Sequence, residues 1–293
     1  MINKIPDRHI VSLSIVVAGV IVAGGLILDR EVAIKGARTK PQSIISEEVT
    51  PRDGVLLPVV WGDLGRQMVQ NETIDEDKMR AIYTERKLND DFETLLTGDS
   101  KDKLVINAEN AGLLLNLFWG LGLSSKNKIL EEGEMMDPKY GGAENFASTG
   151  GWTISRGGAM RHFSVHSYFD LTVEQQELVE GVSRGIYRPC CGNSTHIPDC
   201  NHGMAMLGLL ELMASQGATE DEMWNAALAV NSYWFPDHYR TIATYLGEKS
   251  IVWKDVDPRE VLGYNYSSAE GYARISAALA NKRNPQGSSG CSI

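Results

Sequence analysis

The first regularity along the chain is an uninterrupted apolar run near its start. Residues 10–28 read IVSLSIVVAGVIVAGGLIL and contain no charged side chain. At 1.5 Å per residue this run covers about 28 Å, which is enough to cross the hydrocarbon core of a bilayer. A cleaved signal peptide is the main alternative, because Ala23 and Gly25 are small residues of the kind found before a cleavage site. The apolar run continues through Leu28, however, so the pattern favours an uncleaved single-pass anchor.

Beyond this run, apolar residues recur with helical spacing and are bounded by capping residues. Thr172 and Thr219 are each followed three positions later by Gln or Glu, and Gly217 follows an apolar segment, as is typical of helix starts and ends. Strand-like alternation is confined to residues 55–61. We therefore expect a mainly α fold, in which a single N-terminal transmembrane helix precedes one globular helical domain. The helices are expected at residues 74–86, 111–121, 172–185, 202–216, 219–235, 237–246 and 267–280.

The same patterns divide the chain into five parts. A tether is expected after the anchor, because that stretch contains Pro41 and Pro51 and shows no sustained period. Within the domain, repeated Gly, Asn and Ser predict a long loop over residues 124–158. The predicted parts are a short tail at 1–9, the anchor at 10–28, the tether at 29–59, the helical domain at 60–282 and a flexible Gly/Ser/Cys tail at 283–293.

The net charge of the chain argues against one class of partner, nucleic acid. The chain has 28 basic and 38 acidic residues, a formal net charge of -10, so nucleic acid is not expected as a partner. The short tail before the apolar run carries Lys4 and Arg8, as export signals do, which favours an extracytoplasmic domain. The four basic residues within 29–40 favour the opposite orientation by the positive-inside rule.

Side chains that can bind a metal or act as nucleophiles are most concentrated in the segment from residue 190 to residue 202. It holds Cys190, Cys191 and Cys200, three of the four cysteines, together with His196 and His202. Pro, Gly and Asn make the segment a loop, and it leads into the apolar helix expected from residue 202. Thiolates and imidazole suit soft or borderline metals, above all Zn²⁺ and Cu⁺. The sequence predicts one metal site made by the three thiols and His202.

Helix geometry sets a condition on this site. Within one helix, Cys200 and His202 would point about 200° apart and could not share a ligand. They converge if Cys200 lies in the loop and Asn201 caps the helix. Two further histidines, His162 and His166, are spaced as neighbours on one helical face. We predict a helix there and treat this pair as the most suitable additional metal ligands.

Two other interpretations use the same residues. In the first, the protein is an enzyme whose nucleophile is Cys191 or Cys200, activated by His202 or His166. In the second, Cys190 or Cys191 forms a disulfide with Cys200 and staples a non-catalytic interaction domain. A vicinal bond between Cys190 and Cys191 would be strained and labile, and would act as a redox couple.

The fourth cysteine, Cys291, lies in the C-terminal tail, where nothing in the sequence gives it a packing role. We interpret it as a mobile thiol that could exchange metal or disulfide with the cluster. Taken together, the sequence predicts a membrane-anchored, extracytoplasmic protein that binds a metal ion or uses a redox thiol couple. It does not indicate a reaction or a substrate.

Overall fold

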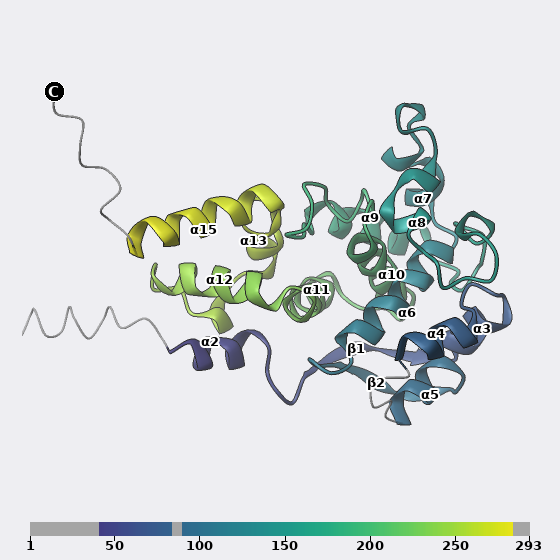
Figure 1. Ribbon diagram of the computed structural model, residues 1–293, viewed down its shortest axis with the longest axis horizontal. Coiled ribbons are helices and arrows are strands. Elements are labelled where there is room, and N and C mark those ends of the chain that lie inside the picture. Colours follow the sequence, from purple (N-terminus) through teal and green to yellow (C-terminus); the bar gives the residue numbers. More distant parts are fainter. Residues whose placement is uncertain (1–40, 84–89, 284–293) are drawn as a thin grey trace, which may run out of the picture. The chain divides into compact units, whose positions relative to one another are not determined.

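The structure is a computed structural model that describes residues 41–83 and 90–283. The chain divides into two compact units, and the described helices and strands all belong to the second unit, which starts at Gln42. Helices dominate this unit (Figure 1), so the prediction of a mainly helical domain is confirmed. The helices are α2 (Gln42–Val49), α3 (Leu64–Gln70), α4 (Glu76–Tyr83), α5 (Asp90–Leu96), α6 (Ala111–Ser124), α7 (Lys128–Glu132), α8 (Ala147–Gly150), α9 (Val173–Gly185), α10 (Asn201–Ser215), α11 (Glu220–Trp234), α12 (Pro236–Gly247), α13 (Pro258–Leu262), α14 (Tyr264–Ser267) and α15 (Ala269–Arg283), and the strands are β1 (Val55–Gly62) and β2 (Ser100–Ile106).

Two apolar helices, α6 and α10, pack against each other in the core (Figure 1). Residues 203–214 of α10 are all buried, as expected of a helix that is apolar around its whole circumference. Glycines allow the two backbones to approach closely. A Cβ at Gly208 would lie 2.5 Å from the carbonyl oxygen of Phe118 and 2.6 Å from the amide nitrogen of Gly122. The N-terminal half of α10, which leads out of the cysteine loop, is therefore held rigidly by α6.

This close approach predicts a stability effect. We expect Gly208→Ala to lower the free energy of unfolding by about 1–3 kcal/mol, because the added methyl group meets backbone atoms that cannot move aside cheaply. Gly181 in α9 is the matched control, since a Cβ there meets nothing within 4 Å. Gly181→Ala should instead stabilise by roughly 0.5–1 kcal/mol through helix propensity. Urea unfolding of both variants checks the difference, and equal midpoints would contradict the packing argument.

A carboxyl group is buried in the same core. Glu211 of α10 is 0% exposed, and the side-chain amide of Asn127 donates a hydrogen bond to its Oε1. Burial raises the pKa of Glu211 to about 8, because a charged carboxylate loses its hydration there. Glu211 is therefore mainly protonated at neutral pH.

The two strands form an antiparallel ribbon in which Leu56 pairs with Val105. In β1, Leu57, Val59 and Trp61 are buried and alternate with more exposed residues, so the predicted strand at residues 55–61 is confirmed. The strand β2 was not predicted from the sequence. Its first four residues are polar or charged and exposed apart from Ser100, so the apolar alternation that marks a strand is absent.

The predicted helix termini are largely confirmed. Thr172 and Thr219 each form a complete capping box, with Gln175 and Glu222 respectively. Gly217 adopts a φ of +77° just after α10, which is the left-handed conformation that ends many helices. Residues 124–158 are less irregular than predicted, because they contain α7, α8 and three short 3-10 helices.

The N-terminal boundary of the domain needs correction. Residues 42–59, predicted to be a tether, form α2 and most of β1, and Ile45 and Val49 of α2 are buried in the core. Apolar side chains within residues 42–49 are too few to reveal a period, yet Ile45 and Val49 complete the core once α12 lies beside α2. The predicted anchor at residues 10–28 lies outside the described residues. Within the described part of the chain, no helix is long and apolar enough to span a membrane.

Candidate metal centre

The cysteine loop connects α9 to α10 and is tied down on several sides. The amide of Thr195 donates to the carbonyl of Ile186, and the carbonyl of Asp199 accepts from Ser148. The carbonyl of Cys191 accepts a 3.0 Å hydrogen bond from the amide of Ala269, the first residue of α15. Backbone bonds to three other segments therefore fix the loop, so the positions of its thiols are determined by the fold.

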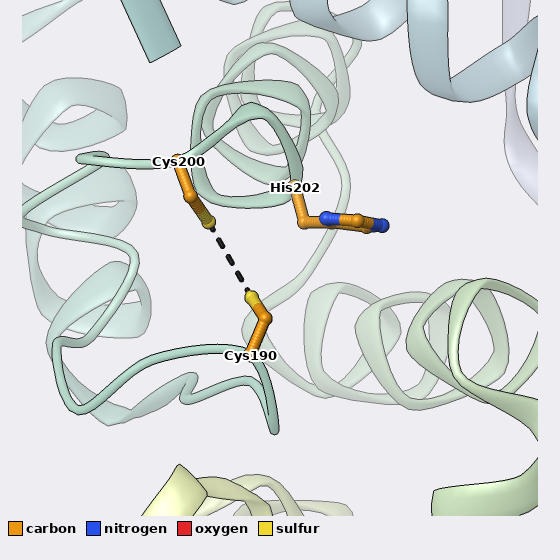
Figure 2. Close-up of side chains that lie close together, drawn as sticks. All are labelled: Cys190, Cys200 and His202. Atoms are coloured by element: carbon orange, nitrogen blue, oxygen red, sulfur yellow. Dashed lines mark hydrogen bonds between the residues drawn. The ribbon is translucent and has the colours of Figure 1, made fainter. Parts of the chain in front are cut away.

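The fold brings the three thiols together. The Sγ atom of Cys200 lies 3.6 Å from that of Cys190 and 4.0 Å from that of Cys191, and the latter two are 3.8 Å apart. Figure 2 shows Cys190 pointing from its loop toward Cys200 at the start of α10. These separations exceed a disulfide bond of about 2.05 Å, so all three are free thiols in this structure.

The size of this triangle matches a metal–thiolate site. Two thiolates on a tetrahedral zinc, with Zn–S bonds of about 2.3 Å, lie about 3.8 Å apart. In the plane of the sulfur atoms, the point equidistant from all three lies about 2.2 Å from each. An ion placed slightly above this plane would reach normal Zn–S distances without any movement of the loop.

Cys200 occupies the N-cap position of α10. Its backbone is extended, with φ −123° and ψ 164°, and its sulfur accepts a 3.4 Å hydrogen bond from the amide of Gly203. The geometric condition for Cys200 and His202 to converge is thus met, because Cys200 lies outside the helix. The cap itself is Cys200 and not Asn201, which is the first helical residue. A helix N-terminus favours a thiolate at this position.

His202 lies near two of the three thiols. One of its ring nitrogens lies within 4.8 Å of the sulfur atoms of Cys190 and Cys200, which are themselves within that distance of each other. Its Nδ1 is buried and has no hydrogen-bond partner among the described residues. The ring packs against Phe235 and Trp234, with centroid distances of 4.4 and 5.7 Å. Buried ring nitrogens normally have a partner, and a metal ion held by the neighbouring thiols could supply one.

Arg188 lies behind the cluster and is only 1% exposed. Its Nε donates to the sulfur of Cys200 at 3.0 Å, and its Nη2 donates to Oδ1 of Asp199 at 2.5 Å. The carbonyls of Asn193 and Ile197 accept two further bonds from the same guanidinium. One buried side chain therefore fixes both ends of the loop, orients Cys200 and places a positive charge beside the thiols.

The thiols share their protons unequally. The hydrogen bonds from Cys190 and Cys191, aided by His202 and the charge of Arg188, hold the pKa of Cys200 well below its usual range. The pKa of Cys190 is raised because its thiol donates to Cys191 and Cys200. The bond from Cys190 lowers the pKa of Cys191, but Cys200 and burial outweigh it and raise that pKa to about 11. Among the three thiols, Cys200 is therefore the one whose surroundings most favour the thiolate.

The contacts of Arg188 give a testable role. We expect Arg188→Lys to weaken zinc binding by about 10–100-fold, as is typical when a residue that orients a metal ligand is changed. Lysine keeps the charge but cannot bond Cys200, Asp199 and two carbonyls at once. Competition with a chromogenic zinc chelator measures the affinity. Arg184→Lys, an exposed change on α9, is the control, and equal affinities for the two variants would contradict the role.

The structure separates His162 and His166 from the thiols. The predicted helix is wrong, because His162 ends a 3-10 helix and a series of turns follows. The two rings still meet, with 3.2 Å between Nδ1 of His162 and Nε2 of His166. The carbonyl of His166 accepts from Lys126, next to the Asn127 that contacts Glu211. Glu211 lies about 15 Å along α10 from its N-terminus, where Cys200 is found, so this pair does not join the cluster.

The residues that sequence reasoning missed are Arg188 and Asp199. Asp199 lies near Cys191 and Cys200 and belongs to a second group with metal-binding spacing. Its oxygens already accept hydrogen bonds from Arg188 and Asn193. The sequence shows Arg188 just before Cys190 and Asp199 just before Cys200, and these positions could have pointed to both residues. Their pairing, however, depends on how the loop folds back. His196, also in the loop, bonds Glu134 at 2.9 Å and belongs to no metal-binding group among the described residues.

Comparison with known proteins assigns no family. No protein-family model matches the chain, and no curated protein or solved structure shows significant similarity to it. The geometry of the thiols and their surroundings is thus the basis for any function.

Proposed function

We propose that this protein is a metal-binding protein whose helical domain holds a soft or borderline ion through Cys190, Cys191, Cys200 and His202. The observation that carries the proposal is the triangle of sulfur atoms, with sides of 3.6–4.0 Å. Three free thiols can adopt these distances through hydrogen bonds to one another, whereas three thiolate ligands of one ion require them. The imidazole of His202 completes the four-ligand set of a Cys₃His zinc site.

Charge favours Zn²⁺ over Cu⁺. Three thiolates around a divalent ion leave one negative charge, and the buried guanidinium of Arg188 lies against it. The same thiolates around Cu⁺ would leave two, with Arg188 already shared by Asp199. Burying a surplus charge is costly, so the divalent ion is the better match. A nitrogen ligand from His202 also suits Zn²⁺ more than Cu⁺.

The alternatives are less well supported. The cavity of about 560 Å³ between α7 and α9 contains no residue of the thiol cluster, so this cavity gives no support to a nucleophilic cysteine. A disulfide between Cys190 and Cys200 needs only a small approach of their sulfur atoms. Such a bond would use two thiols and leave the adjacent Cys191 and the buried Nδ1 of His202 without a role.

Metal analysis of the purified full chain, combined with thiol counting before and after denaturation, tests the proposal. About one equivalent of zinc per chain, with Cys191 and Cys200 protected from modification until denaturation, is the expected result. Absence of metal with one unusually reactive thiol would favour the enzyme. Absence of metal with two thiols lost to oxidation would favour the disulfide-stapled domain.

We further propose that residues 10–28 anchor the domain in a membrane, with the domain on the extracytoplasmic side. The support is the charge-free length of the apolar run and the basic tail that precedes it. The intact mass of the mature chain tests whether the run is retained. A new N-terminus near Leu26 would show that the segment is a cleaved signal peptide.

A further inference from the structure

The four candidate ligands differ in how firmly their surroundings fix them and in how exposed they are. Cys200 is fixed by the helix cap and by Arg188, and His202 is packed against two aromatic rings. The backbone of Cys191 is bonded to the start of α15. Cys190 is exposed, and the side-chain hydrogen bonds that the structure describes for it are both to the other thiols of the cluster. Cys190 is thus the most exposed of the four residues, whereas the other three are half-buried and anchored.

We propose that Cys190 is the exchangeable ligand of this centre and that the metal passes through it to or from another thiol. The inference rests on the proposed metal site. Structural zinc sites are closed, whereas a site that must give up its ion needs a position that an incoming ligand can reach. An exposed thiolate provides that position, and anchored ligands keep the ion in place until exchange is complete.

The exchange step involves no oxidation or reduction. The sulfur of an incoming thiol bonds to the metal, and the bond between the metal and Sγ of Cys190 breaks. The proton lost by the incoming thiol is taken up by Cys190, directly or through solvent, so the number of thiolates on the metal stays at three. Repetition of this step at the remaining thiols would carry the ion to an acceptor with several thiols.

Two thiols with the same chemistry could serve as the incoming ligand. One is a thiol in solution, for which glutathione serves as the probe. The other is Cys291 of this chain. The amide of Ala269 bonds Cys191, so α15 starts beside the cluster and its fifteen residues extend about 21 Å from it. The eight residues from 284 to 291 can span up to about 27 Å when extended, which is long enough to return to the cluster.

The test is site-resolved alkylation of the zinc-loaded full chain, with native mass spectrometry in parallel. We expect iodoacetamide to modify Cys190 at least about tenfold faster than Cys191 or Cys200, since access to the thiolate sets the rate. Glutathione should speed the modification of Cys190 further and produce a complex of protein, zinc and one glutathione. Equal protection of all three thiols, or first release of Cys191 or Cys200, would overturn the proposal.

Two variants complete the experiment. Cys190→Ser removes the ligand to be displaced, so it should bind glutathione about tenfold more tightly than the wild-type protein does, and equal binding would count against the proposal. Cys291→Ser identifies the source of the thiol: a slower modification of Cys190 without glutathione supports Cys291, and an unchanged rate supports a thiol from solution. If the wild-type protein retained no zinc, the metal site itself would be refuted. If it retained zinc but Cys190 were protected from modification, only the exchange through Cys190 would be refuted.

Discussion

Replacement of Cys200 by serine is expected to abolish retention of zinc while leaving the helical fold intact. Structural zinc sites with four ligands gain about 10–16 kcal/mol, so loss of one anchored thiolate should weaken binding on the order of 10³-fold. Serine is a favourable N-cap residue, so α10 keeps a side-chain acceptor for the amide of Gly203. Zinc content and affinity by chelator competition, together with far-UV circular dichroism, measure the two parts of the prediction.

The control for this variant is Cys291→Ser, which removes one thiol without removing a member of the triangle. It should bind one equivalent of zinc with unchanged affinity. A Cys200→Ser protein that bound zinc as tightly as Cys291→Ser would show that Cys200 is not a ligand. A variant that lost its helical signal would call for Cys191→Ser, which leaves the cap of α10 untouched and is expected to lose zinc as well.

Replacement of Glu211 by glutamine is expected to remove a large part of the dependence of stability on pH. Burial raises the pKa of Glu211 to about 8 in the folded protein, whereas an unfolded chain releases this proton at about 4.3. Below the lower value both states hold the proton. As pH rises toward 8, only the unfolded state releases it, so the folded protein loses stability. Glutamine is always neutral and avoids this loss.

The free energy of unfolding of Glu211→Gln, relative to that of the wild-type protein, should therefore rise by about 3.5 kcal/mol between pH 5 and pH 8. Urea unfolding of both proteins at several pH values gives this difference, and contributions from the thiols cancel because both proteins contain them. Glu132→Gln on the exposed side of α7 is the matched control and should show no such growth. A constant difference across this range would mean that Glu211 is ionised in the folded state.

The candidate site shows where pattern reading succeeds. Clustering of Cys190, Cys191 and Cys200 within eleven positions is a local property, and it located the thiol chemistry in one loop. An extended loop of this length could still separate Cys190 from Cys200 by about 33 Å, so the fold decided that their thiols meet. The required position of Cys200 outside the helix also follows from helix geometry alone. What the pattern could not supply is Arg188, because a guanidinium that bonds a sulfur, a carboxylate and two carbonyls reveals itself only when the loop has closed around it.

Other predictions failed for a related reason. His162 and His166 have helical spacing but lie in turns, since the chain there bonds to residues 123–127 and does not form its own helical ladder. Residues 42–49 show no clear period, yet they form the helix α2, whose buried side chains complete the core beside α12. In each case contacts with segments distant in sequence outweighed the local pattern.

By itself, the sequence determined the class of fold, the capped helices that begin after Thr172 and Thr219, and the place of the thiol chemistry. These depend on spacing and on side chains within one turn or one short loop, where the interacting groups are neighbours in the chain. Only the tertiary structure decided that Arg188 lies behind Cys200, that Cys190 is the exposed thiol and that Glu211 is buried. Burial and charge pairing depend on which surfaces the folded helices cover, and that is fixed by packing between helices such as α6 and α10.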